Sequence, residues 1–191
     1  MDIRNFFFSN RSFTPIPVAL SIIYFAQSDN HYILFGVITL LIGEGIRMWS
    51  VSYAGGETRT TNVGAPSLCT AGPYGFVRNP IYVGNILMYL GIVIIAGSPN
   101  PTLMIITTMT FFLIQYSLII SLEEEKLSEL FGEEYNVYRK NVRSIIPRIN
   151  RWKTNDNRSP LPFMKLIKTE KRTLQNVMFV LTLIIIRINY L

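Results

Sequence analysis

Two adjacent carboxylates, Glu123 and Glu124, follow a stretch of the sequence that carries no charge. From residue 79 to residue 122 there is no Asp, Glu, Lys or Arg. Carboxylates at the end of such an apolar segment are costly to bury unless they are paired or lie in a polar cavity. We therefore expect a partner cation near them. The alternative is a charged helix face that only contacts water.

A second polar group, Arg78, stands in a long loop just before the charge-free stretch. Residues 52–78 are rich in Gly, Thr, Asn and Pro, which predicts a turn-rich loop and not a helix. Long ordered loops in small domains are usually functional, and the aromatic and proline content of this one favours order. The alternatives are a plain connector in which Pro80 begins the next helix, and an Arg78 that only anchors to lipid headgroups.

The sequence contains few of the side chains that metal and nucleophilic chemistry require. His31 is the only histidine and Cys69 the only cysteine. This excludes a disulfide framework within the chain, a His/Cys zinc site and a cysteine activated by histidine, so no metal site is expected. Glu44 and Arg47 lie three residues apart in a predicted helix, and we expect them to form an ion pair turned toward the bundle. The glycines beside Glu44 lack the strand and the further glycine of a dinucleotide-binding loop.

The composition indicates a membrane protein. Of 191 residues, 49% are hydrophobic and 16% are charged, whereas soluble domains have about 25% charged residues. A turn at residues 97–101 divides the charge-free stretch into two apolar halves, 81–96 and 102–122, each near the ~17–25 residues that cross a bilayer. Further apolar segments cover residues 15–26, 32–51 and 174–191. We expect an all-α, multi-pass transmembrane helical bundle with four core spans and a C-terminal fifth.

The distribution of Lys and Arg predicts the topology. The turns at residues 27–31 and 97–101 contain neither, whereas the N-terminus and the segments 52–78 and 123–173 hold nearly all of them. Basic residues in short loops collect on the cytoplasmic side. Both ends of the four-span core are therefore expected in the cytosol, at the cytoplasmic membrane of a prokaryote or at the endoplasmic reticulum. The net charge of +6 then indicates anionic lipid headgroups as partners and not nucleic acid.

The chain is expected to divide into a core at residues 1–151, a basic cytosolic linker at 152–173 and a membrane helix at 174–191. An interfacial or core-packing helix is the alternative for the last segment. A cleaved signal peptide is the alternative for the first apolar segment, because residues 26–28 resemble a small-x-small cleavage site. Apolar residues recur at helical spacing over residues 127–142, which predicts an amphipathic helix interrupted near Gly132.

Three motifs, in this order, resemble the integral membrane methyltransferases that include the isoprenylcysteine carboxyl methyltransferases and the phospholipid N-methyltransferases. The first covers residues 68–74 and the second is Arg78-Asn79-Pro80-Ile81-Tyr82-Val83-Gly84. The third is Glu123-Glu124, followed by Leu127, Phe131-Gly132, Tyr135, Tyr138, Val142 and Pro147. A transmembrane hairpin separates the two halves, and the resemblance extends over residues 40–150.

The resemblance implies S-adenosylmethionine as the cofactor, in a cytosol-facing pocket between the loop before the third helix and the segment after the fourth. Carried over residue by residue, it places these residues at the cofactor: Leu68, Cys69, Tyr74, Asn79, Pro80, Tyr82 and Glu123. A sulfonium is a cation that carboxylates and aromatic faces stabilise. Catalytic roles are expected for Arg78, which would orient an anionic group, and for Glu124, which would act as the base if the acceptor is an amine.

The acceptor that the resemblance implies is a lipidic or prenylated molecule that enters from the bilayer. Asn79 stands where many members of the family have His, and residues 119–122 lack the Arg that precedes the Glu pair in eukaryotic prenylcysteine enzymes. An isoprenylcysteine-type carboxylate, a phospholipid amine, a lipid phosphate and a small lipophilic thiol therefore stay open. Two rival functions are an NADPH-dependent membrane reductase related to sterol reductases and a non-enzymatic scaffold whose basic residues bind anionic lipid.

Overall fold

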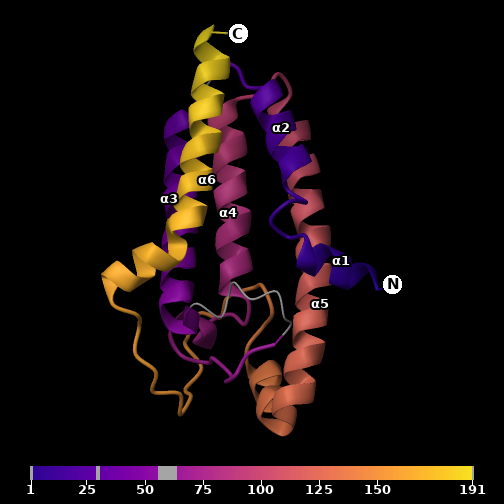
Figure 1. The fold of residues 1–191 in the computed structure, drawn as a ribbon, viewed down its shortest axis with the longest axis vertical. Helices are drawn as coiled ribbons and strands as arrows, with labels where there is room; N and C mark the ends of the chain where they lie inside the picture. Colours follow the sequence, from indigo (N-terminus) through magenta and orange to yellow (C-terminus); the bar gives the residue numbers. More distant parts are fainter. Residues whose placement is uncertain (1, 29–30, 56–63, 191) are drawn as a thin grey trace.

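The computed structural model describes residues 2–28, 31–55 and 64–190, and these residues form helices and loops without a β-strand. The helices, drawn in Figure 1, are α1 (Ile3–Ser9), α2 (Ile16–Tyr24), α3 (Ile33–Ala54), the short 3-10 helix η2 (Gly72–Gly75), α4 (Pro80–Ala96), α5 (Pro101–Asn141) and α6 (Phe163–Tyr190). The predicted all-α, multi-pass fold is confirmed. Residues 56–63 of the predicted loop lie outside the described residues.

Three of the helices, α3, α5 and α6, are long and apolar enough to cross a membrane. Helix α4 is apolar but shorter, with 17 residues. Helix α2 has nine residues, which span only about 14 Å at a rise of 1.5 Å per residue, less than half of a ~30 Å hydrocarbon core. The first predicted span, residues 15–26, is therefore wrong in length, because the helix begins only after Pro15 and ends before Phe25.

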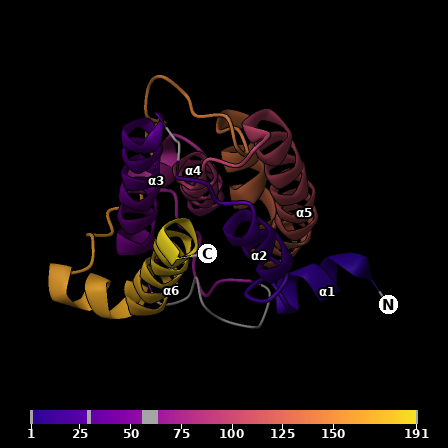
Figure 2. The same cartoon turned by 90° about the horizontal axis from the view of Figure 1, so that it is seen from above.

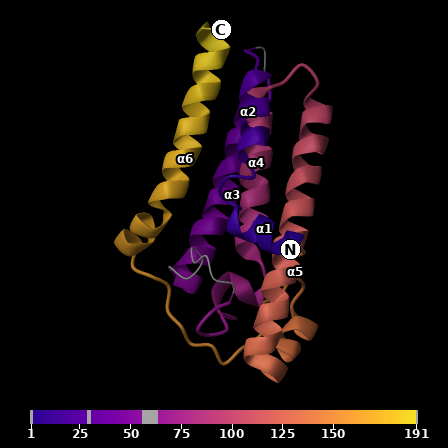
Figure 3. The ribbon, with the colours of Figure 1, turned by 45° about the vertical axis from the view of Figure 1, so that its right-hand side comes forward.

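The helices lie side by side around α4, which is at the centre when the bundle is seen from above, with α2 and α6 on one side of it (Figure 2). Two contacts tie the helix ends at one end of the bundle together. The Gln27 amide donates to the Ala96 carbonyl at 2.8 Å, and Arg187 Nε donates to the Tyr24 carbonyl at 3.2 Å. The loop before α4 and the segment after α5 lie at the opposite end (Figure 3). These are the two ends that the distribution of basic residues assigns to opposite sides of the membrane, and that assignment stays a prediction.

Four glycines allow α3 and α4 to approach closely: Gly36 and Gly43 on α3, and Gly84 and Gly91 on α4. A Cβ atom built on Gly91 would lie 2.5 Å from the Leu40 nitrogen and 2.7 Å from the Gly36 carbonyl oxygen. A Cβ atom on Gly43 would lie 2.7 Å from the Gly84 carbonyl oxygen. Small residues at such crossings are how membrane helices bring their backbones together. The backbones of α3 and α4 therefore lie in direct contact at these four glycines.

Replacing Gly91 with alanine is expected to lower the free energy of unfolding by ~1–3 kcal/mol, the usual cost of overpacking a close contact. The obstructing atoms are backbone atoms of α3, so the helices would have to separate. Thermal unfolding in detergent measures the loss. Gly45→Ala is the matched control, because no atom of the described residues lies within 4 Å of a Cβ at this position. A Gly91→Ala protein as stable as the control would contradict the close packing.

Helix α5 continues beyond the apolar stretch through the Glu123–Glu124 pair and then folds back on itself. The reversal occurs at Gly132, whose φ of 51° and ψ of −120° are accessible to glycine at little cost. The predicted interruption near Gly132 is confirmed. The returning segment buries Tyr135, Tyr138 and Val142 in one cluster. The fold-back thus returns residues 135–144 to the level of the glutamates.

Helix α6 begins at Phe163, well before residue 174, where the sequence predicted the last helix. The additional turns carry Lys165, Lys168 and Glu170, which reduce hydropathy but are good helix formers. Figure 1 shows these first turns at an angle to the rest of α6. Residues 153–162 contain no helix, as expected. The division of the chain at residues 151 and 173 stays a prediction.

Candidate active site

Glu124 is the centre of a buried polar network where α5 leaves the apolar layer. Its Oε1 accepts hydrogen bonds from Arg78 Nε at 3.1 Å, from Arg78 Nη2 at 2.7 Å and from Ser144 Oγ at 3.1 Å. Asn79 Nδ2 donates to the same oxygen at 3.3 Å. The expected partner cation is therefore Arg78, which the sequence places 46 residues earlier.

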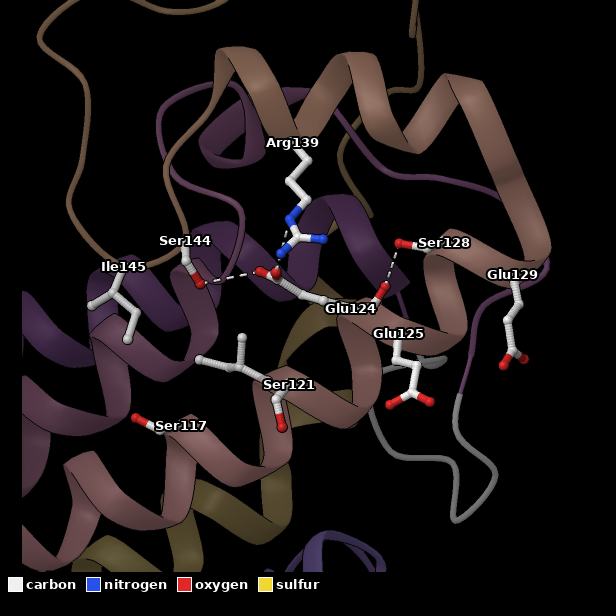
Figure 4. Close-up of a pocket in the computed structure, with 10 residues that line it drawn as sticks. Ser117, Ser121, Glu124, Glu125, Ser128, Glu129, Arg139, Ser144 and Ile145 are labelled. Carbon is white, nitrogen blue, oxygen red and sulfur yellow. Dashed lines mark hydrogen bonds and ion pairs between the residues drawn. The ribbon is translucent and has the colours of Figure 1, made fainter.

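Arg78 also holds the end of the returning helix. Its Nη1 donates to the carbonyl of Arg139 at 3.1 Å and to that of Val142. Figure 4 shows Arg139 and Ser144 pointing at Glu124 from the returning segment. Arg139 Nε lies 3.8 Å from Glu124 Oε2. These contacts border a shallow cavity of about 760 Å³ on the outer side of α5. Arg78 and Glu124 thus join three segments of the chain.

Glu123 points away from this network, toward the interior of the bundle. Its Oε1 accepts a hydrogen bond from the Tyr82 hydroxyl at 3.0 Å. The Tyr82 ring lies against Tyr116, with the ring centroids 4.8 Å apart. The two adjacent glutamates therefore have different surroundings: Glu124 is paired with arginine, and Glu123 is bonded to a tyrosine that α4 supplies.

One large cavity, of about 810 Å³, brings nearly all the predicted site residues together. Glu124 lines the other cavity instead. The predicted site residues that line the large cavity are Leu68, Cys69, Tyr74, Arg78, Asn79, Pro80, Tyr82 and Glu123. They come from the loop before α4, from the first turn of α4 and from α5. Segments far apart in the sequence thus form one cavity wall.

The cavity has a polar part and an apolar part. Tyrosines and arginines line it near the start of α4, whereas its walls higher in the bundle are apolar residues of α2, α4 and α6: Ile16, Ala19, Leu20, Ile22, Ile23, Met88, Ile92, Val177, Phe179, Val180 and Leu183. The lining extends along α4 from Pro80 to Ile92, a rise of about 18 Å at 1.5 Å per residue. The cavity therefore reaches from the basic end of the bundle well into its apolar layer.

Sequence reasoning missed an ordered segment, residues 151–162, that fixes the loop on the cavity wall. Asp156 Oδ2 accepts hydrogen bonds from the Thr70 amide at 2.9 Å and from the Ala71 amide at 3.2 Å. Arg158 Nη2 donates to the Leu68 carbonyl at 2.9 Å, and Arg158 lines the cavity. Partial burial would raise the pKa of Asp156, but hydrogen bonds from Thr70 and Arg158 hold it below its usual range. Only the clustering of polar residues in this stretch could have indicated such contacts.

The substitution Asp156→Asn is expected to speed hydrogen exchange of the Thr70 and Ala71 amides by roughly tenfold or more, since hydrogen bonds to a charged group contribute ~1.5–3 kcal/mol. Exchange followed by mass spectrometry on peptides that cover residues 66–74 measures it. Because the pKa of Asp156 is lowered in the folded protein, the protection is present at neutral pH and is lost as the pH falls through that lowered value. Asp2→Asn, at the other end of the chain, is the control and should leave these amides unchanged.

Two residues of the loop, Cys69 and Tyr74, are half-buried. The Tyr138 hydroxyl donates to the Tyr74 carbonyl at 2.7 Å, which joins the returning helix to η2. Burial raises the pKa of the Tyr74 hydroxyl well above its usual value and raises the pKa of the Cys69 thiol to about 11. Both groups are therefore neutral at physiological pH, and Cys69 is a poor nucleophile there.

The predicted ion pair between Glu44 and Arg47 is wrong. Arg47 instead pairs with Glu170 of α6, and its Nη1 donates to Asn85 Oδ1 at 2.7 Å. Neither carboxylate oxygen of Glu44 has a hydrogen-bond partner among the described residues. The tertiary partner is 123 residues away in the sequence, so the spacing of three residues on α3 could not identify it. Within the described ranges, no group of His, Cys, Asp and Glu side chains could hold a metal ion.

Residues 31–134, more than half of the chain, match the phospholipid methyltransferase family. The chain belongs to the phospholipid methyltransferase family. The family resemblance inferred from the three motifs is thereby confirmed, and with it a multi-pass membrane protein. The matched segment contains every predicted site residue. It ends before residues 135–158, which complete the polar network and the cavity wall.

Proteins that are similar to this chain carry different names. A protein-S-isoprenylcysteine O-methyltransferase of Schizosaccharomyces pombe is 39% identical over 43% of this chain and 34% of its own length. The cobalt-zinc-cadmium resistance protein CzcN of Cupriavidus metallidurans is 28% identical over 61% of this chain and 48% of its own length. A methanethiol S-methyltransferase of Bradyrhizobium diazoefficiens is 35% identical over 39% of this chain and 24% of its own length. This chain thus spans less than half of each of these relatives, and no solved structure matches it significantly.

Proposed function

We propose that the protein transfers a methyl group from S-adenosylmethionine to a lipidic acceptor at the cytosolic face of a membrane. The observation that carries the proposal is the large cavity, which joins the family's motif residues to an apolar wall within one enclosure. Two relatives named as an O-methyltransferase and an S-methyltransferase support the reaction class. A methyl donor that is polar and an acceptor that is apolar would meet where the two parts of the cavity join.

The residues of the polar part fit S-adenosylmethionine. The cofactor carries a positive sulfonium and an amino acid group, and the cavity offers a carboxylate, Glu123, beside the aromatic faces of Tyr74 and Tyr82. Carboxylates and aromatic faces attract cations. Arg158, on the same wall, offers a guanidinium for the carboxylate of the cofactor. A cavity of about 810 Å³ is also within the ~300–1,000 Å³ of small-molecule sites.

When bound, S-adenosylmethionine supplies an electrophilic methyl group. The protein then has to align donor and acceptor and to exclude water, which together can contribute up to ~7–11 kcal/mol. Glu123 balances the positive charge, and the hydrogen bond from Tyr82 fixes its orientation. Arg78 and Glu124 hold the loop and the returning helix in place around the site.

The geometry favours Glu124 as a positioning residue over the role of base that was expected for an amine acceptor. Its Oε1 already accepts hydrogen bonds from Arg78, Asn79 and Ser144, and it lines the outer cavity. Glu124 therefore lies outside the large cavity in which donor and acceptor would meet. If the acceptor is an amine, Glu123 is the carboxylate that the large cavity presents to it.

The acceptor class follows from the apolar part of the cavity, which suits a hydrocarbon chain. An isoprenylcysteine-type carboxylate, a phospholipid amine and a lipid phosphate all carry such a chain. The polar part of the cavity lies at the end of the bundle where Arg139, Lys140, Arg143, Arg148, Arg151 and Lys153 gather. Because basic residues of short loops collect on the cytoplasmic side, this end is proposed to face the cytosol and anionic lipid headgroups.

Calorimetric titration of the detergent-purified protein tests the proposal. The ligands are S-adenosylmethionine, its demethylated product S-adenosylhomocysteine, and NADPH. Micromolar binding of the first two without binding of NADPH is expected, followed by transfer of a labelled methyl group to lipid extract. Binding of NADPH alone would replace the proposal with a reductase, and binding of none of the three would favour a scaffold that acts through Lys165, Lys168, Lys171 and Arg172.

A further inference from the structure

Helix α6 forms a wall of the large cavity but is packed loosely against the bundle. Of its 28 residues, only Leu166, Glu170 and Ile184 are buried. Met178 and Phe179 are each 64% exposed. The residues of α6 that line the cavity are Arg172, Thr173, Asn176, Val177, Phe179, Val180 and Leu183. Because so few of its residues are buried, α6 can move as a unit relative to the rest of the bundle.

The charged attachment between α6 and α3 is a buried ion pair. Glu170 is fully buried, and its Oε2 accepts a hydrogen bond from Arg47 Nη2. The same Nη2 lies 2.9 Å from Thr173 Oγ1. Separating such a pair inside an apolar layer leaves both charges without a partner. The pair therefore holds α6 closed for as long as Arg47 has no other carboxylate to bind.

Another carboxylate is available one turn earlier on α3. Both oxygens of Glu44 are buried, and in the described part of the chain they accept no hydrogen bond. Arg47 Nε is likewise buried without an acceptor there. Residues three apart share one face of a helix, so a change of side-chain rotamers brings Arg47 to Glu44. Arg47 thus has two carboxylates within reach and binds one.

We propose that Arg47 is a two-position latch that controls access to the cavity from the bilayer. In the closed state, which the structure shows, it binds Glu170 and holds α6 against α3. In the open state it binds Glu44, which releases α6 and opens the cavity between α2 and α6. Arg47 pairs with one carboxylate in each state. The free energies of the open and closed states can therefore lie close enough for both states to be populated.

The role of the latch rests on the proposed function, because its purpose is to admit an apolar acceptor. An opening between α2 and α6 faces hydrocarbon, because Ile16 and Leu20 of α2 are 47% and 59% exposed on the apolar part of the cavity. The polar part of the cavity is not involved, so a water-soluble ligand would reach its site whether the latch is open or closed.

Cys69 provides the test, because it is the only cysteine of the chain and lines the cavity. The protein is reconstituted in phosphatidylcholine nanodiscs and the rate of alkylation of Cys69 is measured with two reagents. A dodecyl maleimide enters from the bilayer, and a sulfonated maleimide enters from water. The ratio of the two rates reports the opening between α2 and α6, independently of methyl transfer.

The two neutral variants are expected to change this ratio in opposite directions. Glu170→Gln removes the carboxylate that Arg47 binds in the closed state, and we expect it to raise the ratio of the dodecyl to the sulfonated maleimide rate about tenfold. Glu44→Gln removes the carboxylate that Arg47 binds in the open state, and we expect it to lower this ratio severalfold. If Glu170→Gln fails to fold, Thr173→Ala weakens the same attachment and should raise the ratio about threefold. Glu134→Gln, an exposed position on α5, is the matched control and should leave the ratio unchanged.

A rise of the ratio in both variants would overturn the latch, because it would mean that any change in the buried cluster loosens the bundle. An unchanged ratio in Glu44→Gln would overturn it too, since Glu44 would then have no part in the open state. Failure of the proposed function shows differently: S-adenosylmethionine would not bind to the unmodified protein, while the opposite responses of Glu44→Gln and Glu170→Gln would remain.

Discussion

Glu123→Gln is expected to weaken binding of S-adenosylmethionine by roughly ten- to a hundredfold, the range that corresponds to the ~1.5–3 kcal/mol of an interaction with a charged group. Glutamine keeps the shape of the side chain and can still accept the hydrogen bond from Tyr82. It removes the only carboxylate that lines the large cavity within the described residues. Calorimetric titration measures the loss, and methyl transfer should fall with it.

Two variants make this experiment specific. Glu134→Gln removes a charge from an exposed position on the same helix and is expected to leave the affinity unchanged. Tyr82→Phe keeps the charge of Glu123 but removes the hydrogen bond that orients it, so a smaller loss, of about tenfold or less, is expected. An affinity that survives Glu123→Gln would show that the cofactor lies elsewhere in the cavity.

The largest loss of stability is expected from Arg78→Ala, at ~3–5 kcal/mol, because the substitution leaves a buried carboxylate without its partner. The side chains of Arg78 and Glu124 are only 9% and 11% exposed. Arg78 also loses its hydrogen bonds to the carbonyls of Arg139 and Val142. Thermal unfolding followed by tryptophan fluorescence measures the loss, because Trp152 lies with its ring centroid 5.6 Å from that of Tyr138 on the returning helix.

A double-mutant cycle separates the ion pair from the other contacts of Arg78. Glu124→Ala leaves the arginine unpaired and should destabilise the protein as well. The double variant should be less destabilised than the sum of the two, because neither charge is then left alone. Lys126→Ala is the control, since its ion pair with Glu129 on the same helix is exposed and contributes ~0–1 kcal/mol. Additive losses would mean that Arg78 and Glu124 act independently.

The parts of the fold that depend on local composition could be predicted from the sequence. The hairpin of α4 and α5 follows from a charge-free stretch with a Gly-Pro turn, and the reversal at Gly132 follows from a glycine within an amphipathic pattern. The grouping of Arg78, Tyr82 and Glu123 came from the order of the motifs, since no spacing rule places residues more than 40 positions apart side by side. The length of α2 could not be predicted, because apolar composition continues beyond its last turn.

Other parts of the site depend on contacts between distant segments. Asp156 reaches the Thr70 amide across 86 residues, and Glu170 reaches Arg47 across 123. Residues 151–162 show no apolar period, so their polar side chains are typical of a linker as well as of a segment that binds a loop. The spacing of three residues on α3 indicated Glu44 as the ion-pair partner of Arg47, whereas Arg47 pairs with Glu170 on another helix. Whether Arg47 binds Glu44 or Glu170 depends on how the helices pack, and helix packing cannot be derived from a single sequence.

The fold-back of α5 at Gly132 also determines the order in which the protein can be completed during synthesis. A nascent chain that has emerged only as far as α4 has Arg78 but not Glu124, and the carbonyls of Arg139 and Val142 that Arg78 binds come later still. Asp156 and Arg158, which fix the loop at residues 68–71, follow after the returning helix. The insertion of the helical hairpin therefore precedes the assembly of the site. The contacts that fix the loop at residues 68–71 can form only after residue 158 has been translated.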